Sequence, residues 1–325
     1  MTTTSLLAAP LAQIIAAELA RPVPDAVHAL SNDIRRRHGD AVAAVLFYGS
    51  CLRKNTLEGV LDFHVVVDSY RAAYASRLLA CVNAILPPNV FYVEGQHDNH
   101  ALRMKYGIFS SADFHDAAST ASRHAIVWGR FSQPFVLVYA RDEQARAMVL
   151  QSAVESVLTF MTYATAELAA PDGTLNCAAE DLWQQGFQET YRSELRPERP
   201  ETIRSLYAAA PNRYDQVAQE ALLLLEQRGM LQVVATDRQL SMTMPPAQRQ
   251  RFRTMWHRRL PLAKILYAIR LLKSALTFGD WLPYVLWKFH RHTGVQIELT
   301  ERQRKYPLIW GWPVIFRVLA RRELR

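Results

Sequence analysis

A glycine turn and a following carboxylate are the residues of this chain best suited to chemistry on phosphates. The apolar run from Val42 to Tyr48 ends at Gly49-Ser50, and Asp62 opens a second apolar run twelve residues after Ser50. A bare backbone turn lets amides approach phosphates, and a carboxylate beside it can hold Mg²⁺. The pattern predicts a nucleotide-transferring site. Taken alone, it fits an ordinary hairpin turn followed by a strand-end acid equally well.

Further polar side chains follow Asp62 on the same strand. Alternate strand residues face one side, so His64 and Asp68 share the face of Asp62. His64 stands where many such enzymes carry a second acid, and it either contacts phosphate or metal or is a buried histidine. Asp68 lies about 20 Å from Asp62 along an ideal strand, too far to share one ion. It therefore contacts substrate or merely ends the strand, and Glu94 is the candidate that would complete the metal site.

The elements that must position these residues alternate between strands and helices. We predict strands over 42–48, 60–67, 90–93, 101–108 and 135–139. The helices between them make residues 1–145 an α/β (α+β) domain. Residues 146–240 have helical spacing and predict a helical or winged-helix-like domain. Residues 245–325 are basic and aromatic, and they predict an amphipathic helical region.

Composition limits the class of protein. Half of the 325 residues are hydrophobic, which indicates a globular protein with a sizeable core. The three cysteines, Cys51, Cys81 and Cys177, lie far apart without the spacing of a zinc site or a disulfide framework. The first 22 residues lack the basic start of a signal peptide. We therefore expect a reducing, cytoplasmic setting.

Positive charge is concentrated at the end of the chain. Residues 245–325 contain 17 Lys or Arg and 4 Asp or Glu, whereas the first 244 residues carry a net charge of −5. This segregation predicts an anionic partner, either lipid or nucleic acid, unless the segment is only a solvated basic face. The apolar stretch from Leu260 to Phe278 is interrupted by Lys264, Arg270 and Lys273. It fits a helix in a membrane interface, or a core helix, better than a membrane span.

Several motifs in order carry a resemblance to a known family. Residues 43 to about 145, and more loosely to 207, resemble the mitochondrial translocator assembly and maintenance family of phosphatidate cytidylyltransferases. The matching segments are Tyr48-Gly49-Ser50, Leu61-Asp62-Phe63, Val67-Asp68, Lys105-Tyr106-Gly107-Ile108, Gly129-Arg130, Gln133-Pro134 and Tyr191-Arg192-Ser193-Glu194-Leu195-Arg196. The last segment departs from the family's Tyr-x-Gly-Asp-x-Arg, because Ser193 and Glu194 replace Gly-Asp. No segment after about residue 240 matches by motif.

The resemblance implies a fold and a reaction. Members of this family transfer CMP from CTP to phosphatidic acid with Mg²⁺, which gives CDP-diacylglycerol and pyrophosphate. They combine a nucleotidyltransferase domain, a winged-helix-like domain and a C-terminal membrane-associating part. We therefore expect CTP, phosphatidic acid and an anionic membrane surface as partners, with the protein peripheral on the inner face of a membrane. We expect no nucleic-acid partner.

The resemblance and the residue chemistry together assign roles. Lys105 would neutralise the triphosphate, Arg130 would clamp a phosphate, and Glu194 would act as a base or pair with Arg196. The nucleotide site would contain Tyr48, Gly49, Ser50, His64, Lys105, Tyr106 and Arg130. The catalytic residues would be Asp62, Lys105 and Glu194, the metal ligands Asp62 and Glu94, and the acceptor-binding residues Asp68, Tyr191 and Arg196.

Two other functions fit parts of the sequence. A nucleotidyltransferase acting on RNA or a soluble acceptor would use the basic segment to bind a phosphodiester backbone. A non-catalytic membrane adaptor with the same fold would explain why His64 stands in place of a second acid. Salt-sensitive RNA binding would favour the first alternative, and the absence of any transfer reaction would favour the second.

Overall fold

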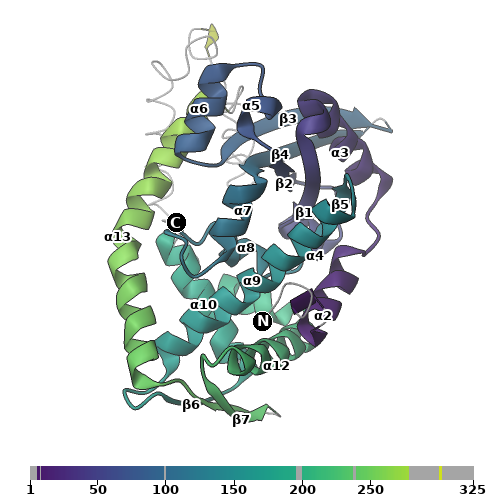
Figure 1. Ribbon diagram of the computed structural model, residues 1–325. Coiled ribbons are helices and arrows are strands. Elements are labelled where there is room, and N and C mark those ends of the chain that lie inside the picture. The colour runs from purple at the N-terminus through teal and green to yellow at the C-terminus, as the bar shows by residue number, and fades with distance from the viewer. Residues whose placement is uncertain are drawn as a thin grey trace.

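The computed structural model describes residues 6–7, 9–98, 100–194, 200–236, 239–277 and 300–301. Arg196 and the aromatic segment that follows Thr277 therefore lie outside the described residues. A five-stranded sheet occupies one end of the molecule, a set of helices the other, and the long helix α13 (Pro246–Thr277) runs along one side of both (Figure 1).

The five-stranded sheet is mixed, with the order β3-β4-β2-β1-β5. Its strands are β1 (Val42–Tyr48), β2 (Val60–Val67), β3 (Asn89–His97), β4 (His100–Ser110) and β5 (Val136–Ala140). β2 and β4 run parallel, and the other neighbouring pairs are antiparallel. The predicted bounds of β1 and β2 are confirmed, and the mixed α/β class of this part of the chain is as predicted.

The two faces of this sheet belong to different apolar clusters because strand residues alternate in direction. On one face, Phe47 and Phe63 pack with Val27 and Leu30 of α3 (Asp25–His38). This face also contacts α5 (Tyr70–Ala73) and α6 (Arg77–Ile85).

The other face of the sheet carries Asp62 and meets the rest of the molecule. Leu46, Val66 and Phe109 pack there with residues of α7 (Ser111–Ala118), α8 (Trp128–Phe131) and α9 (Glu143–Leu168). α9 is buried on nearly all sides, since α2 (Pro10–Leu19), α10 (Ala179–Ser193), α12 (Pro211–Gln227) and α13 all contact it. One apolar core thus continues across the boundary predicted at residue 145.

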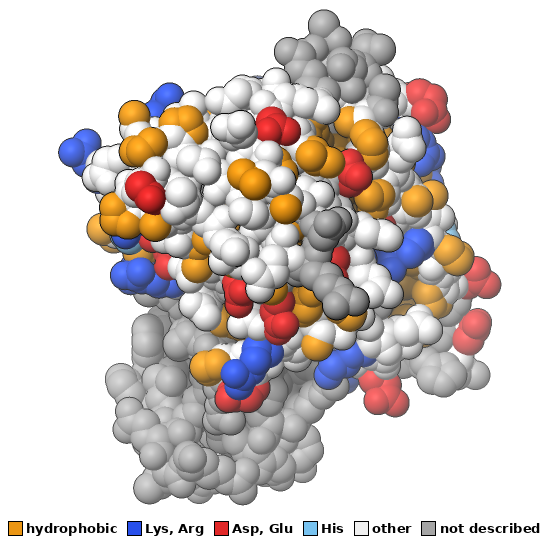
Figure 2. Space-filling model, turned by 90° about the horizontal axis from the view of Figure 1, so that it is seen from below, with side chains coloured by type: hydrophobic (Ala, Val, Ile, Leu, Met, Phe, Trp, Pro, Cys, Tyr) orange, Lys and Arg blue, Asp and Glu red, His pale blue; other side chains and the backbone are white. Residues whose placement is uncertain are grey.

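The remaining elements of the second half are α11 (Pro200–Ala208) and a small antiparallel sheet. Its strand order is β6-β8-β7, with β6 (Thr174–Cys177), β7 (Gln232–Thr236) and β8 (Leu240–Thr243). Helices with a three-stranded sheet are compatible with the predicted winged-helix-like unit. On the face seen from below in Figure 2, hydrophobic side chains are scattered among polar and charged ones.

The helix α13 (Pro246–Thr277) is a single long element whose inner face joins the core. Phe252, Trp256 and Leu260 are buried, and the helix contacts α9, α10 and β3. The start of the predicted separate C-terminal region is therefore packed against the preceding parts of the chain. Among the described residues, no helix has both the length and the apolar character needed to cross a bilayer.

Candidate nucleotide-binding site

The turn after β1 places a glycine directly against a carboxylate. Gly49 has φ +93°, a conformation that side chains with a Cβ rarely adopt. A Cβ at this position would lie 2.9 Å from Asp62 Oδ2, because Tyr48 and Asp62 are paired across β1 and β2. Ser50 then begins the short helix α4 (Ser50–Lys54). Glycine is thus required here both by the backbone and by the neighbouring acid.

Asp62 is paired with a lysine from the strand on its other side. In the parallel register of β2 and β4, Asp62 stands beside Lys105, and the Lys105 Nζ lies 2.8 Å from Asp62 Oδ1. The side chains of Asp62 and Lys105 are 19% and 33% exposed, so this pair opens toward solvent only in part. The central strand therefore carries a half-buried carboxylate with a cation on one side and the Gly49 turn on the other.

A second ion pair closes the opposite side of the site. Arg130 of α8 donates from Nη1 to Glu194 Oε1 at 2.5 Å and from Nη2 to Glu194 Oε2 at 2.8 Å. Arg130 also donates to the Ile126 carbonyl at 3.0 Å. Burial disfavours the charged form of Arg130, but the Glu194 carboxylate outweighs this effect, so its pKa is raised.

A close approach of two helices explains how Arg130 and Glu194 meet. A Cβ on Gly129 would lie 2.8 Å from Thr190 Cγ2, so α8 and α10 touch at a position that only glycine fits. Glu194 follows Thr190 by about one helical turn and reaches Arg130, the residue after Gly129. The Gly129-Arg130 motif is therefore both a packing contact and a charged contact.

A pocket of about 150 Å³ lies between these elements. Seven of the predicted site residues line it: Tyr48, Gly49, Ser50, Asp62, Arg130, Tyr191 and Glu194. The volume is below the roughly 300–1,000 Å³ of ordinary small-molecule sites. A pocket of this size suits one or two phosphate groups.

Five lining residues were not predicted as site residues: Arg53, Gly129, Gln133, Pro134 and Thr190. Arg53 follows Ser50 by one turn of α4, so its position after the Gly-Ser turn is a signal that the sequence contains. Gln133 donates to the Gly129 carbonyl at 2.9 Å and holds the turn after α8. Thr190 is the residue that Gly129 contacts, and only the tertiary packing reveals this.

His64 is buried inside the fold behind this pocket. Its side chain is 4% exposed, and its ring stacks on Tyr48 with 5.0 Å between centroids and 7° between planes. Burial, and after it the charge of Arg130, lowers the pKa of His64 to about 3. Burial and the Asp62 carboxylate raise the pKa of Tyr48 to about 12. Both rings are therefore neutral, and His64 occupies the core position that was one of its two predicted roles.

Tyr106 lies on the opposite face of the sheet from Asp62. Its hydroxyl is 3.2 Å from His38 Nε2, and its ring stacks on Phe91 at 5.3 Å. Lys105 and Tyr106 are consecutive strand residues, so their side chains point to opposite faces. The prediction that Tyr106 binds the nucleotide together with Lys105 is thus wrong.

Glu94 does not share a site with Asp62. β4 separates β3 from β2, which puts Glu94 two strands away, or about 10 Å across the sheet. Its carboxylate is 59% exposed, lies 3.4 Å from Arg103 Nε, and accepts a hydrogen bond from the Tyr92 hydroxyl at 2.7 Å. The prediction of a metal site shared by Asp62 and Glu94 is contradicted by this strand order.

Asp68 lies at the other end of β2, away from the pocket. It accepts two hydrogen bonds from Arg141, at 2.6 and 3.0 Å, and its side chain is 49% exposed. Asp68 is therefore a surface ion pair at the strand end, which was the alternative to its predicted contact with the acceptor. Arg196, also predicted to bind the acceptor, lies outside the described residues, and Glu194 is paired with Arg130.

The carboxylates of the pocket limit how a metal could bind. Among the residues that the structure describes, no three His, Cys, Asp or Glu side chains gather at one point. Both Glu194 oxygens are held by Arg130, which leaves Asp62 as the carboxylate that can face a ligand. Mg²⁺ in nucleotide sites is often bound by one or two carboxylates plus phosphate oxygens. The pocket fits an ion that arrives with the nucleotide, and does not fit a cage of protein ligands.

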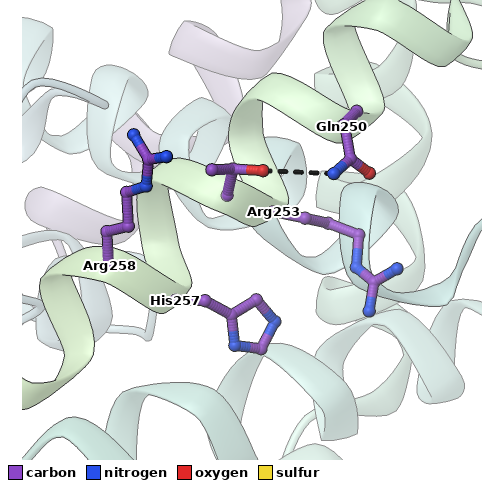
Figure 3. Close-up of a pocket in the computed structure, with 5 residues that line it drawn as sticks. Gln250, Arg253, His257 and Arg258 are labelled. Atoms are coloured by element: carbon purple, nitrogen blue, oxygen red, sulfur yellow. Dashed lines mark hydrogen bonds between the residues drawn. The ribbon is translucent and has the colours of Figure 1, made fainter.

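A broader depression, of about 420 Å³, lies on the surface of α13. Gln250, Arg253, Thr254, His257 and Arg258 line it (Figure 3). Arg253 and His257 both reach Glu167 of α9, at 3.3 and 2.7 Å, whereas Arg258 extends to the other side. Arg253 and His257 therefore hold α13 against α9, while Gln250 donates to the Thr254 hydroxyl within α13.

Comparisons with known proteins give distant structural similarity and no match by sequence. No protein-family model matches the chain, and no curated protein matches it by sequence. Among solved structures, the chain is similar to a nucleotidyltransferase-like protein from Exiguobacterium sibiricum, with 12% identity and a TM-score of 0.26. The similarity covers 81% of this chain and 80% of that one. A likeness this distant bears on no residue and no substrate.

Proposed function

We propose that this protein is a cytidylyltransferase that moves CMP from CTP to the phosphate of phosphatidic acid, with Mg²⁺. The observation that carries the nucleotide-transfer part is the convergence of Gly49, Asp62 and Arg130 at one pocket. These residues come from separate segments of the chain, and the Gly49 turn touches the Asp62 carboxylate. The choice of CTP and of phosphatidic acid rests on the sequence motifs.

The side chains of the pocket suit a triphosphate. The backbone at Gly49-Ser50 faces the site without a side chain in the way, so its amides can approach phosphate oxygens. Arg53 and Arg130 line the pocket, and Lys105 adjoins it through Asp62. Three cations against two carboxylates can offset phosphate charge as it shifts onto the leaving pyrophosphate. Mg²⁺, when bound with the nucleotide, would neutralise further phosphate charge beside Asp62.

The proposed reaction needs no general base. An oxygen of the acceptor phosphate already carries negative charge, so it can attack the α-phosphorus of CTP directly. One P–O bond forms, the bond between the α-phosphorus and the bridging oxygen breaks, and pyrophosphate leaves. Positioning and charge neutralisation carry such an in-line transfer. Glu194 therefore acts in this proposal through Arg130, whose guanidinium it holds in place, and is not the catalytic base that its sequence position suggested.

The packing of the basic helix weighs against a nucleic-acid acceptor. α13 carries eight Lys or Arg, but Arg249, Arg270 and Lys273 are buried, with 6–8% of each exposed. Two more, Arg253 and Arg259, bind Glu167 and the Thr120 carbonyl. Most of the positive charge in this helix therefore serves internal contacts, and little of it remains for a phosphodiester backbone.

The proposal is tested by measuring labelled CDP-diacylglycerol made from CTP, Mg²⁺ and phosphatidic acid in mixed micelles. We expect Asp62→Asn to reduce product formation by at least about 100-fold, because the variant removes a carboxylate that faces the ligand. The matched control is Asp68→Asn, which changes the same residue type on the same face of β2. It should leave the rate within about twofold of wild type.

Three outcomes of this experiment are informative. Loss of product in Asp62→Asn alone supports the proposal. Equal losses in both variants would point to a general effect on the sheet and would overturn the placement of the site. No product from a wild-type protein that binds CTP would reject phosphatidic acid as acceptor, and RNA and soluble phosphate acceptors would then be screened.

A further inference from the structure

Exposed apolar side chains are concentrated on two helices. Seven of the eight large apolar side chains that are exposed among the described residues belong to α6 or to the second half of α13. The eighth is Val234 on β7, 69% exposed. The seven side chains, with 40–77% of each exposed, are Leu78, Ile85, Leu262, Ile265, Ile269, Leu271 and Leu272.

The outer face of α13 changes character along its length. Leu262, Ile265, Ile269 and Leu272 follow one another at steps of three or four residues, so they form one stripe. Their Cα atoms span about 15 Å of helix axis. The same outer face carries Arg251 and Arg258 in the first half of the helix, both exposed. The helix thus presents a basic half followed by an apolar half to the outside.

The apolar half of α13 lies beside α6 (Figure 1). Lys273 donates to the Leu86 carbonyl at the end of α6, and Arg270 donates from Nε to the Pro87 carbonyl at 2.7 Å. On α6, Leu78 and Ile85 are seven residues apart and share a face with the exposed Cys81. These contacts join the two stripes into one surface, which we call the α6–α13 surface.

Charge distinguishes the possible occupants of the α6–α13 surface. Neither helix contains an Asp or Glu, whereas Arg251 and Arg258 of α13 and Arg77 at the start of α6 are exposed. An apolar stripe flanked only by positive charge suits the boundary between headgroups and acyl chains of an anionic bilayer. A second copy of this chain would bring the same positive charges face to face, which is unfavourable.

The inner side of the same helix faces the candidate site. Burial lowers the pKa of Arg270 to about 10, and the charges of Glu194 and Arg130 act on it in opposite directions. Arg270 therefore lies near the Arg130–Glu194 pair, while Ile269 and Leu272 point outward. The exposed apolar stripe and the buried Arg270 therefore lie on opposite sides of α13.

We propose that the α6–α13 surface docks on an anionic lipid bilayer, with Leu78, Ile85, Ile265, Ile269 and Leu272 entering the headgroup and acyl boundary. This inference deepens the proposed function, because it identifies the face on which a lipid acceptor is met. It assigns α6, a helix of the sheet-containing part, to the membrane contact together with α13. Of the three cations that interrupt the apolar stretch of α13, Arg270 and Lys273 face the interior.

The first test is co-sedimentation of the full chain with vesicles made of equal parts of phosphatidylcholine and phosphatidylglycerol. We expect the double variant Ile269→Glu, Leu272→Glu to lose at least about tenfold in partitioning, because two exposed apolar groups become anionic. The matched control is Val234→Glu, an exposed apolar residue outside the α6–α13 surface. It should bind as wild type does. Pure phosphatidylcholine vesicles should bind the wild type more weakly.

A probe on α6 tests its part in the contact. Cys81 is exposed, Cys51 is buried, and Cys177 can be replaced by serine to remove background labelling. An environment-sensitive fluorophore on Cys81 should shift to shorter wavelength when vesicles are added. Binding without this shift would remove α6 from the proposed surface and overturn that part of the proposal.

The remaining outcomes of these experiments distinguish a lipid bilayer from a second copy of the chain as the occupant of the α6–α13 surface. If the double variant binds vesicles as wild type does, the proposal is wrong. If wild type ignores vesicles but is a dimer by light scattering and the double variant is a monomer, the surface joins two copies, which also overturns it. The vesicles contain no phosphatidic acid and no CTP is added. A protein that binds them but makes no CDP-diacylglycerol would overturn the proposed reaction and leave the docking surface standing.

Discussion

The two ends of β2 carry the same kinds of residues in opposite settings. At the pocket end, Asp62 pairs with Lys105 beside Gly49, whose φ is +93°. At the other end, Asp68 pairs with Arg141, and Gly39, with φ +60°, stands two residues before Ala41, whose carbonyl accepts a hydrogen bond from the Asp68 amide. Each end therefore has an acid, a cation and a glycine with a positive φ.

The difference between the ends lies in what surrounds them. Asp62 is 19% exposed and lines a pocket to which α4, α8 and α10 also contribute, whereas Asp68 is 49% exposed. A Cβ on Gly49 would strike Asp62, whereas a Cβ on Gly39 would meet nothing within 4 Å. An acid paired with a cation is therefore not enough to define a site. The pocket end differs because segments that are distant in the sequence converge around Asp62.

The largest expected effect comes from removing the two cations in turn. We expect Lys105→Met to lower kcat/KM for nucleotide transfer by about 100- to 1,000-fold, or about 2.7–4 kcal/mol, because it removes positive charge from the phosphates. Arg141→Met should leave kcat/KM within about twofold of wild type. Steady-state kinetics on both variants would make the comparison, and a large loss in Arg141→Met would break it.

The next largest expected difference is in the stability of alanine variants at Gly49 and Gly39. Each adopts a backbone conformation that is essentially restricted to glycine, so alanine at either position costs about 1–3 kcal/mol. Gly49→Ala additionally pushes a Cβ against Asp62 Oδ2 and Cβ, at 2.9 and 3.3 Å. We expect Gly49→Ala to destabilise the protein by about 1 kcal/mol more than Gly39→Ala. Urea unfolding of the two variants measures this difference.

Nucleotide-transfer activity provides a second comparison between Gly49→Ala and Gly39→Ala. Because Gly49 supports the Asp62 carboxylate, Gly49→Ala should also reduce nucleotide transfer at temperatures where the variant is fully folded. Gly39→Ala should retain wild-type transfer. Equal stability and equal transfer activity of the two variants would show that the close contact between Gly49 and Asp62 affects neither folding nor the reaction.

The pocket end of β2 was predictable from sequence to a useful degree. Four of the eight residues of 60–67 are valine, and a glycine turn ends 42–48, so both strands and the proximity of Asp62 to Gly49 follow from local pattern. The opposite directions of Lys105 and Tyr106 also follow from strand alternation. The prediction that put both at the nucleotide failed because it followed the motif and ignored that alternation.

Other features depend on tertiary structure and could not be predicted. The exclusion of Glu94 from the metal site follows from β4 lying between β3 and β2, an order that local pattern does not encode. Glu194 meets Arg130 only because Gly129 touches Thr190. Arg270 and Lys273 are buried in α13, although charged residues are seldom buried, so local pattern does not indicate their inward position.

The stability of the protein should depend on pH through His64, the histidine behind the pocket. The pKa of His64 is about 3 in the folded protein, whereas an unperturbed histidine has a pKa of 6.5. Below pH 6.5 the unfolded chain therefore takes up a proton that the folded protein does not, and stability should fall as the pH decreases from 6.5 toward 3. At pH 5 this contribution amounts to about 2 kcal/mol.

The variant His64→Phe tests that contribution, because phenylalanine keeps the stack on Tyr48 and cannot titrate. We expect the difference in unfolding free energy between pH 7 and pH 5 to be about 2 kcal/mol smaller in His64→Phe than in wild type. Urea titrations at the two pH values measure it. Identical pH dependence in both proteins would mean that His64 is protonated in the fold, and the pocket end would then be more open than its burial indicates.

The smallest effect should come from the surface pair itself. The Arg141 and Asp68 side chains are 38% and 49% exposed, so solvent screens their attraction even though the contact is bidentate. A double-mutant cycle with Asp68→Asn and Arg141→Met should give a coupling energy of about 0.2–1 kcal/mol, and added salt should lower it. The same cycle on transfer activity should give no coupling. Coupling of several kcal/mol in stability, or any coupling in activity, would show that the outer end of β2 is linked to the pocket and that the contrast between the two ends is false.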